Sequence, residues 1–470
     1  MRMFYPDYPV AHLRPAPYNP RRIAEPAFRA LCDSLATLGM LKPIIIAETG
    51  MIVAGHQRLK ALTATGATTA PVFVITGLNK QDEMRFNQLH NGTDLDAGDE
   101  QVRVPPSDTL GYMDVPARQI CGQRNGRAAA VREAIAELLL LYGPWGGIVA
   151  SQAGECLSGA PYALACMMTN TPCRVAYVAD HHAPLVRATF AQTYGEFCYD
   201  ALEKTTYAQT WAQLHRLRPE DGKRVTRTII SPNYEQVYIP NFRPGERILD
   251  FGCGQGDYVR MLQRRGVRIW GVEFFFRIGQ QLNTQATHKM IDSLIATLHQ
   301  HGRFDTVICE YVLNSTDSMA AERAVMGCLN AFCKPGGRIY ASGRLLSDPT
   351  HYVNNTATSS SSRYTIYFLD QDHFTAKVRN GTWFYQHYHT PETGTALARD
   401  YIGPDAVYEQ LGGAALFLVR GTKQFEFPPD QVEAALTFEF NLPWPHEQRV
   451  GRHREVIAAY HAAVRKEQMS

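Results

Sequence analysis

The stretch Ile248-Leu-Asp-Phe-Gly-Cys-Gly-Gln-Gly-Asp257 decides the fold of the carboxy-terminal half of the chain. Its apolar beginning predicts a β-strand, and the segment that follows it, Tyr258-Val-Arg-Met-Leu-Gln263, is predicted to be a helix. The glycines between them let the backbone turn tightly and approach a ligand, with a helix N-terminus behind it. From Glu246 to about Leu346 strands and helices alternate, which indicates a parallel sheet covered by helices. This half is therefore predicted to be an α/β domain with a cofactor loop of the nucleotide-binding type.

An acidic residue follows the next predicted strand. Arg268-Ile-Trp-Gly-Val272 runs into Glu273, 23 residues after Asp250, and a carboxylate in this place can accept hydrogen bonds from both hydroxyls of a ribose. The D-x-G-x-G-x-G pattern resembles the loop of class I S-adenosylmethionine-dependent methyltransferases more than the dinucleotide-binding fingerprint. The resemblance implies a Rossmann-like fold and S-adenosylmethionine as the cofactor. The residues that it assigns to the cofactor are Asp250, Gly252, Gly254, Gly256 and Glu273.

Further segments follow in the order of that family. Phe304-Asp-Thr-Val-Ile-Cys-Glu-Tyr-Val312 resembles its fourth strand, and Lys334-Pro-Gly-Gly-Arg-Ile-Tyr-Ala341 resembles the turn and fifth strand. Asp292 is a candidate for the contact with adenine. We expect the methyltransferase core at residues 241–350 and a substrate-facing extension at 351–470. The alternatives are a Rossmann-like domain for another nucleotide, or a relic without activity.

The residues after the fourth strand bear on the methyl acceptor. Enzymes that methylate exocyclic amines of bases resemble one another in a [DN]-P-P-[YFW] motif there, whereas this chain has Cys309-Glu310-Tyr311-Val312. Tyr311 could stack on a flipped base, and Glu310 could accept a proton, which makes them the candidate catalytic residues. The missing motif favours the alternative of a small molecule, a nucleotide or a protein as the acceptor.

The amino-terminal segment carries a different pattern. Tyr18-Asn-Pro-Arg21 and Ile52-Val-Ala-Gly-His-Gln-Arg-Leu-Lys-Ala61 resemble the ParB/sulfiredoxin-like domain, which we place at residues 1–95. A strand that ends in Gly-x-x-Arg before a helix offers amides and a guanidinium fork to phosphate. The resemblance implies binding of a nucleotide or of DNA. The candidate residues are Asn19, Arg21, Gly55, His56, Gln57 and Arg58.

Two departures limit this resemblance. Sulfiredoxins have a cysteine where His56 stands, so their redox chemistry is not expected. The Glu-Asn-x-x-Arg phosphate motif of the family becomes His90-Asn-Gly-Thr-Asp94, which argues against ParB-type CTP hydrolysis.

An internal repeat follows the first module. Three glycines recur with a constant shift of 104 (143−39, 154−50, 159−55), and they pair as Gly39 with Gly143, Gly50 with Gly154, and Gly55 with Gly159. Residues 107–200 are therefore predicted to be a second, diverged copy, so the two form a tandem or pseudo-dimeric pair. The second copy has Ala160-Pro161-Tyr162 in place of the residues after Gly55, without a phosphate donor. Residues 201–240 are expected to be a linker with a helix from Tyr207 to Leu217.

Composition sets outer limits on the protein. A chain of 470 residues predicts two to four domains, and its formal net charge of +2 means that any contact with nucleic acid comes from a local patch. The ten cysteines form no C-x-x-C pair, which favours reduced thiols in the cytoplasm and gives no sign of a metal site. His387 and His389 share one face of an aromatic strand, but the sequence places no acidic partner near them. No apolar run is long enough to span a membrane.

These features predict an α/β protein with a Rossmann-like class I methyltransferase domain and tandem ParB/sulfiredoxin-like α+β modules. Such modules resemble those fused to DNA-modifying methyltransferases of phages and mobile elements, which implies DNA as the partner. A homodimer is compatible with this arrangement. A third hypothesis is a nucleotide-gated DNA-binding adaptor without catalysis.

Overall fold

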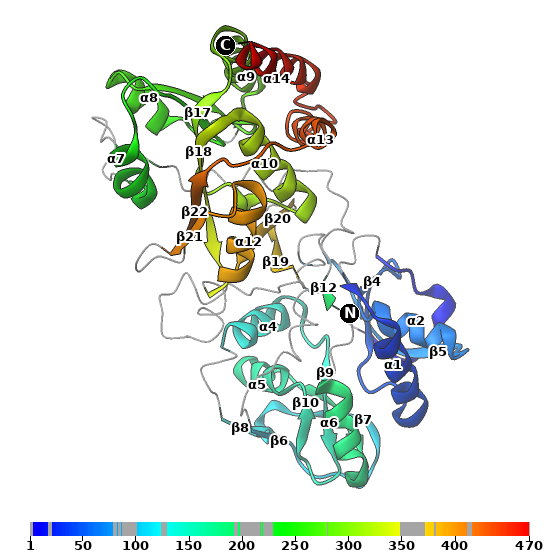
Figure 1. Ribbon diagram of the computed structural model, residues 1–470. Helices are drawn as coiled ribbons and strands as arrows, with labels where there is room; N and C mark the ends of the chain where they lie inside the picture. The colour runs from blue at the N-terminus through cyan, green and yellow to red at the C-terminus, as the bar shows by residue number, and fades with distance from the viewer. Residues whose placement is uncertain are drawn as a thin grey trace. The chain divides into compact units, whose positions relative to one another are not determined.

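The computed structural model describes residues 3–16, 21–78, 82, 86, 101–123, 129–191, 196–197, 217, 219, 229–279, 281–347, 372–379, 382–410 and 416–469. The chain divides into two compact units, formed mainly by Met1–Glu203 and by Lys204–Asp348 with Thr382–Ser470 (Figure 1). Within the described ranges, no helix combines the length and the apolar character that crossing a membrane requires.

A four-stranded sheet with the order β1-β5-β3-β4 forms the first module of the amino-terminal unit. β5 is antiparallel to β1 and parallel to β3, and β3 is antiparallel to β4. The elements are β1 (Met3–Pro9), η1 (Val10–His12), β2 (Arg21–Arg22), α1 (Glu25–Leu38), β3 (Ile44–Ala47), β4 (Ile52–Ala54), α2 (His56–Ala64) and β5 (Thr69–Ile75). The isoleucines of β3 are buried because both faces of this short strand are covered.

A second sheet of the same unit has the order β7-β11-β9-β10, with each pairing in the same direction as in the first sheet. Its elements are β6 (Val102–Arg103), β7 (Gly111–Val115), η2 (Ala117–Gln119), β8 (Cys121–Gly122), α4 (Ala129–Tyr142), β9 (Gly147–Ser151), β10 (Cys156–Ser158), α5 (Ala160–Thr169), β11 (Cys173–Val178), η3 (Asp180–His182), α6 (Ala183–Ala191) and β12 (Glu196–Phe197). This shared topology supports the proposal that residues 107–200 are a second copy of the module.

One pair of glycines shows the correspondence in detail. Gly55 and Gly159 precede α2 and α5 in the left-handed conformation, with φ of 109° and 89°. A Cβ at Gly55 would lie 3.1 Å from Ile44 Cγ1, and one at Gly159 would lie 3.1 Å from Ile148 Cγ2. Both pairs differ by the predicted 104 positions, so the same close approach recurs in both modules.

The two modules share a hydrophobic core. Phe86 lies edge-on against Trp145 at a centroid distance of 5.1 Å, and the Arg174 guanidinium lies 3.9 Å from the centre of the Phe4 ring. One continuous buried cluster contains residues of both sheets. In the described part of the chain, the two modules therefore pack against each other as one unit.

The carboxy-terminal unit is built on a larger sheet. β14, β13, β17 and β18 are parallel in this order, β22 is antiparallel to β18, and β21 pairs with β22. Its strands are β13 (Arg247–Phe251), β14 (Arg268–Val272), β15 (Arg277–Ile278), β16 (Gln281–Leu282), β17 (Phe304–Cys309), β18 (Cys333–Leu345), β19 (Phe374–Arg379), β20 (Thr382–His389), β21 (Val407–Gln410) and β22 (Leu416–Thr422). The expected Rossmann-like α/β fold is confirmed.

Helices cover both faces of this sheet. Leu249 and Phe251 of β13 belong to the core with α9, α10, α13 and α14, whereas Ile248, the residue before Leu249, belongs to the core with η6 and α8. In Figure 1, α14 lies beside α9 and α13 near α10. The helices are η6 (Tyr234–Tyr238), α7 (Ile239–Asn241), α8 (Asp257–Arg264), α9 (Thr284–His301), η7 (Leu313–Ser315), α10 (Met319–Phe332), α12 (Pro391–Tyr401), α13 (Pro429–Glu439) and α14 (His453–Gln468).

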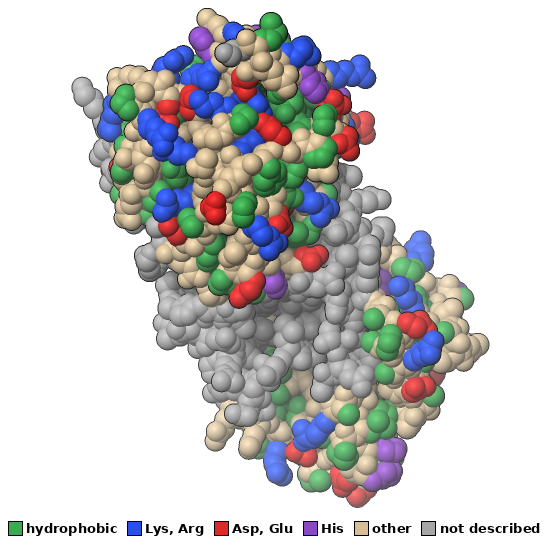
Figure 2. Space-filling model, viewed as in Figure 1, with side chains coloured by type: hydrophobic (Ala, Val, Ile, Leu, Met, Phe, Trp, Pro, Cys, Tyr) green, Lys and Arg blue, Asp and Glu red, His purple; other side chains and the backbone are tan. Residues whose placement is uncertain are grey.

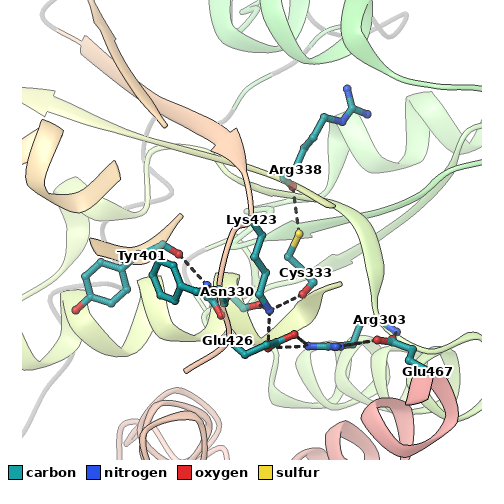
Figure 3. Close-up of polar contacts among 9 residues, drawn as sticks. Arg303, Asn330, Cys333, Arg338, Tyr401, Lys423, Glu426 and Glu467 are labelled. Atoms are coloured by element: carbon teal, nitrogen blue, oxygen red, sulfur yellow. Dashed lines mark hydrogen bonds and ion pairs between the residues drawn. The ribbon is translucent and has the colours of Figure 1, made fainter. Parts of the chain in front are cut away.

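Buried charges join strands and helices at the amino ends of β17 and β18. Lys423 Nζ donates to the carbonyls of Asn330 and Cys333 at 2.7 and 2.9 Å and to Glu426 at 2.8 Å. Arg303 bonds the same Glu426 and also Glu467 of α14 (Figure 3). Both cations are almost fully buried and fully paired, which is the condition under which buried charge is tolerated. This cluster has a structural role at the sheet end opposite the glycine loop.

The expected linker at 201–240 is only partly described. Most of the helix expected from Tyr207 to Leu217 lies outside the described residues, as do Asn19 and the segment His90–Asp94. Residues 229–241 form η6 and α7 and pack within the carboxy-terminal unit, because Tyr234 and Tyr238 bury their rings in its core.

Candidate cofactor site

The strand order reverses direction at the central strand of the large sheet. From β13 the chain passes to β14 on one side and then returns to β17 on the other side. In open α/β sheets, ligands bind in the crevice at the carboxyl ends of the two strands that flank such a switch point. Asp250 lies at the end of β13, and Glu310 follows β17.

The glycine loop wraps this end of the sheet. Gly252, Gly254 and Gly256 have φ of 82°, 58° and 66°, where glycine is favoured. A Cβ at Gly252 would lie 2.3 Å from Cγ2 of Val312. Glycine is therefore required at this position both for its conformation and for the close approach of the two loops.

Asp250 is buried beneath the loop. Its Oδ2 accepts a hydrogen bond from the Tyr234 hydroxyl at 2.5 Å, whereas Oδ1 has no partner among the described residues. Burial raises the pKa of Asp250 to about 7, against the effect of the Tyr234 hydrogen bond. A buried carboxylate oxygen without a partner fits a donor on a bound ligand.

Glu273 holds the shape of the loop. Its Oε2 accepts from the Gly254 amide at 2.9 Å and its Oε1 from the Phe275 amide at 2.8 Å. Since each carboxylate oxygen can accept more than one hydrogen bond, the predicted contact with ribose hydroxyls remains compatible with these two.

Glu310 lies in a buried ring of donors. Its carboxylate accepts hydrogen bonds from Ser231 Oγ, Asn233 Nδ2, Tyr238 Oη and Ser342 Oγ. Four donors thus occupy both oxygens of this buried carboxylate. Glu310 is therefore better placed to hold the segment around η6 than to take a proton from a substrate.

Tyr311 has a strained backbone at the rim of the same crevice. Its φ of 57° is unusual for a bulky residue, and its amide donates to Ser342 Oγ at 3.0 Å. Burial raises the pKa of the Tyr311 hydroxyl, so the phenol stays protonated at neutral pH. Outliers of this kind concentrate at functional sites, and here the strained residue lines the cavity.

The sequence did not identify the segment from Ser231 to Tyr238. It forms a π-helical turn, a feature often found at functional sites. Tyr234 stacks on Tyr258 at 4.0 Å and reaches Asp250, while Tyr238 reaches Glu310. The spacing of the two tyrosines by one helical turn is the signal that could have suggested a shared buried face.

Together these residues enclose a cavity of about 550 Å³. Its far wall comes from the carboxy-terminal extension, where Phe438, Glu439 and Arg449 line it. Glu439 is buried, and burial together with the charges of Asp317 and Glu273 raises its pKa to about 8. Of the predicted cofactor residues, Asp250, Gly252, Gly254 and Glu273 line this cavity, whereas Gly256 and Asp292 are not among its lining residues. Asp292 is exposed on α9 and bonds Arg452 at 2.6 Å, so the structure gives no support to a contact with adenine.

The candidate residues of the first module make internal contacts. His56 Nε2 accepts the Ala16 amide at 3.0 Å, and burial and nearby cations lower its pKa to about 4, which keeps it neutral. Arg58 donates to the carbonyls of Lys42 and Pro43. Gln57 is buried and Arg21 lies in β2.

The second module has a hydrogen-bonded contact in the corresponding place, but its side chain accepts where Arg58 donates. Tyr162, at the position of Arg58, accepts hydrogen bonds from the amides of Trp145 and Gly146 at 3.1 and 2.9 Å. Both side chains thus tie the helix to the loop before the neighbouring strand. Part of the Arg58 guanidinium is accordingly occupied within the protein.

Comparison with known proteins assigns both units. A model of the methyltransferase domain matches residues 223–390, and a model of the ParB N-terminal domain matches residues 7–92. The ParB-like nuclease domain-containing protein YnaK of Escherichia coli K12 is 31% identical over 77 residues, which are 16% of this chain and 88% of YnaK. A probable chromosome-partitioning protein ParB of Xylella fastidiosa is 39% identical over 70 residues, 14% of this chain and 23% of that protein.

Solved structures resemble the carboxy-terminal unit at low identity. The PH0226 protein of Pyrococcus horikoshii is 14% identical, with a TM-score of 0.30 over 41% of this chain and 88% of that one. The CcbJ methyltransferase of Streptomyces caelestis is 13% identical, with a TM-score of 0.29 over 47% and 100%.

Fold, glycine loop and family match together define the carboxy-terminal unit as a methyltransferase domain of the Rossmann-like class. Through its amino-terminal domain the chain belongs to the ParB-like family, and it joins the two domains in one polypeptide. It spans about a quarter of the length of the Xylella partitioning protein that it matches.

Proposed function

We propose that the chain is an S-adenosylmethionine-dependent methyltransferase that acts on DNA, with the ParB-like pair binding nucleic acid or a nucleotide. The observation that supports S-adenosylmethionine as the cofactor is the charge of the residues that line the cavity. Among the residues that the structure describes, six acidic residues line the cavity and one basic residue does, namely Asp250, Asp257, Glu273, Glu310, Asp317 and Glu439 against Arg449.

An acidic cavity discriminates between the nucleotide-type ligands of Rossmann-like folds. Dinucleotides and nucleoside triphosphates carry phosphates, which these carboxylates would repel. S-adenosylmethionine has no phosphate and carries an ammonium group and a sulfonium ion. The unpartnered Oδ1 of Asp250 suits the ammonium group, and the Glu273 carboxylate suits ribose hydroxyls. When bound, this cofactor supplies an electrophilic methyl group.

The residues of this chain then orient the two reactants. Methyl transfer requires a nucleophile in line with the methyl group, so positioning supplies most of the catalysis. Tyr311 and the partly exposed Phe438 offer aromatic faces at the cavity. Two aromatic side chains are suited to stacking on a base, which supports a nucleic-acid acceptor held partly by the 351–470 extension.

The ParB-like domain supports the choice of DNA, because relatives of this domain are named as chromosome-partitioning proteins. In Figure 2 the Lys and Arg side chains of the carboxy-terminal unit lie among Asp and Glu side chains. Contact with DNA is therefore expected at a local patch, as the net charge of +2 also requires.

Incubation with methyl-labelled S-adenosylmethionine tests the proposal. Duplex DNA, single-stranded DNA, RNA, nucleotides and protein lysate are offered separately, to wild type and to Asp250→Ala. Label that enters DNA and disappears in the variant supports the proposal. Label in a small molecule or a protein supports the second candidate, which the absent [DN]-P-P-[YFW] motif favours. Cofactor binding without transfer to any pool supports the adaptor hypothesis.

A further inference from the structure

Three buried side chains converge away from the cofactor cavity. β20 places His387 and His389 on one face of the sheet, and α10 places Glu322 opposite them. The Glu322 Oε2 atom lies 2.7 Å from Nδ1 of His387 and 2.8 Å from Nε2 of His389. At most 4% of any of these side chains is exposed, so bulk water does not balance their charge.

The backbone fixes the proton on one of these rings. Nε2 of His387 lies 3.0 Å from the carbonyl oxygen of Asp372, which can only accept a hydrogen bond. Nε2 therefore carries a hydrogen, and Nδ1 faces the Glu322 carboxylate at 2.7 Å. Nδ1 is thus the nitrogen of this ring that can coordinate an ion shared with the carboxylate.

We propose that Glu322, His387 and His389 bind a divalent transition-metal ion, with zinc as the best fit. Two imidazoles and one carboxylate are a common ligand set for zinc. The hydrogen bond from His387 to a backbone carbonyl is the outer contact that metal-binding histidines typically make. The three ligand atoms already lie within 4.8 Å of one another. Ligand atoms around a tetrahedral zinc ion lie about 3.3 Å apart. The Glu322 oxygen and the two histidine nitrogens must therefore move apart by roughly half an ångström to accommodate the ion.

The surroundings favour a structural ion. Phe374 stacks on His387 with a centroid distance of 3.9 Å and an interplanar angle of 10°, and Phe417 lies 4.8 Å from the His389 ring. This apolar shell keeps the three ligands in place, and the fourth position of a tetrahedral ion would be taken by water. The ion would tie β20 to the first turn of α10, and the neighbouring residues Ser318 and Ala321 line the cofactor cavity.

The test measures metal binding directly on the full chain. Protein stripped with a chelator is titrated with zinc and separately with cobalt, whose visible absorption reports its ligands. We expect one zinc per chain, an unfolding midpoint raised by several degrees, and cobalt bands that His389→Ala abolishes. The matched control is His461→Ala, because His461 also pairs with a glutamate, Glu433 at 2.8 Å, but at the surface. This variant should bind cobalt as the wild type does.

Two results would overturn the proposal. One is a wild-type protein that binds neither ion in stoichiometric amount and melts at the same temperature with or without zinc. The other is a folded His389→Ala variant whose cobalt spectrum equals that of the wild type. If His389→Ala does not fold, Glu322→Gln gives the second comparison, and the wild-type spectrum and stoichiometry still decide the question.

Discussion

Two carboxyl groups in the cofactor cavity have pKa values far above the ordinary range. Burial raises the pKa of Asp250 to about 7 and that of Glu439 to about 8. Asp250 has the Tyr234 hydroxyl as a partner, but Glu439 is buried among other acids. Each proton that these groups hold in the folded state is lost as pH rises. Without a cationic ligand, the folded state should therefore weaken from about pH 4.5 to pH 8.

Glu439→Gln should remove part of this pH dependence. The pKa of Glu439 is higher in the folded state than its ordinary value of 4.5. Its contribution to the free energy of unfolding is therefore complete below pH 4.5 and is lost as the pH rises to about 8. Urea unfolding of the ligand-free protein at pH 5.5 and 8.5 measures this loss. Between these two pH values the free energy of unfolding should fall by on the order of 2 kcal/mol less in the variant than in the wild type. The exposed Glu455→Gln serves as the control. An equal pH dependence in wild type and Glu439→Gln would show that Glu439 ionises freely.

Gly252→Ala should weaken cofactor binding strongly at a modest cost in stability. The new Cβ would lie 2.3 Å from Val312 and would require a φ near 82°, so the loop must shift away from the cavity. We expect cofactor affinity to fall at least tenfold and stability to fall by about 1–3 kcal/mol. Gly266→Ala is the control, because Gly266 also has a φ of 82°, but its Cβ would meet no atom within 4 Å and it does not line the cavity. Calorimetric titration of both variants checks the difference, and equal affinities would contradict it.

At the scale of elements, single side chains join helices to the ends of strands. Arg58 ties α2 to the carbonyls before β3, and Tyr162 ties α5 to the amides before β9. Lys423 and Arg303 join α14 and the chain after β22 to the start of β17 and β18. These contacts separate residues that hold the fold from residues that can bind a ligand.

Arg58→Ala separates the two roles of that guanidinium. Loss of its bonds to the Lys42 and Pro43 carbonyls should lower stability by about 1–2 kcal/mol. If Arg58 also contacts phosphate, DNA or nucleotide binding should fall, while affinity for S-adenosylmethionine stays unchanged. Tyr162→Phe weakens the corresponding bridge without removing a charge. Equal loss of DNA binding in both variants would assign Arg58 a structural role alone.

Lys423→Met should destabilise the carboxy-terminal unit without changing its cofactor affinity. The methionine removes the buried donor that Lys423 provides to Glu426 and to two backbone carbonyls, at a cost of about 3 kcal/mol in unfolding free energy. Arg420→Met in β22 is the control, since the pair of Arg420 with Glu409 is partly exposed and should contribute less than about 1 kcal/mol. Chemical unfolding resolves these values. A large effect on S-adenosylmethionine affinity would contradict the separation of cluster and site.

At the scale of the whole molecule, local patterns in the sequence predicted the domain types well. The glycine loop, Glu273 and the strands β13, β14, β17 and β18 lie where the spacing placed them, because each depends on neighbouring residues. Contacts between distant segments could not be predicted. Glu322 precedes His387 by 65 positions (387−322), and Tyr234 reaches Asp250 only through a π-helical turn. Asp292, the candidate for the adenine contact, lies exposed on α9 and pairs with Arg452, because position in a helix alone does not fix which face is buried.

The two units differ in the kind of ligand that their side chains favour. The ParB-like pair has one copy with an arginine and one with a tyrosine at the same position, so any phosphate contact is expected at the first copy. The methyltransferase domain brings an acidic cavity that the aromatic side chains of Tyr311 and Phe438 also line. The claim on which the proposed function depends is that this cavity selects a cationic, phosphate-free cofactor.

Isothermal titration of the purified chain with S-adenosylmethionine, ATP and NAD tests that claim most directly. We predict saturable binding of S-adenosylmethionine at one site per chain, at least tenfold weaker in Asp250→Ala, and no measurable binding of NAD or ATP to this cavity. Because the ParB-like pair could itself bind a nucleotide, competition with S-adenosylmethionine identifies the site. Displacement of S-adenosylmethionine by NAD or ATP, or failure of S-adenosylmethionine to bind at all, would contradict the claim.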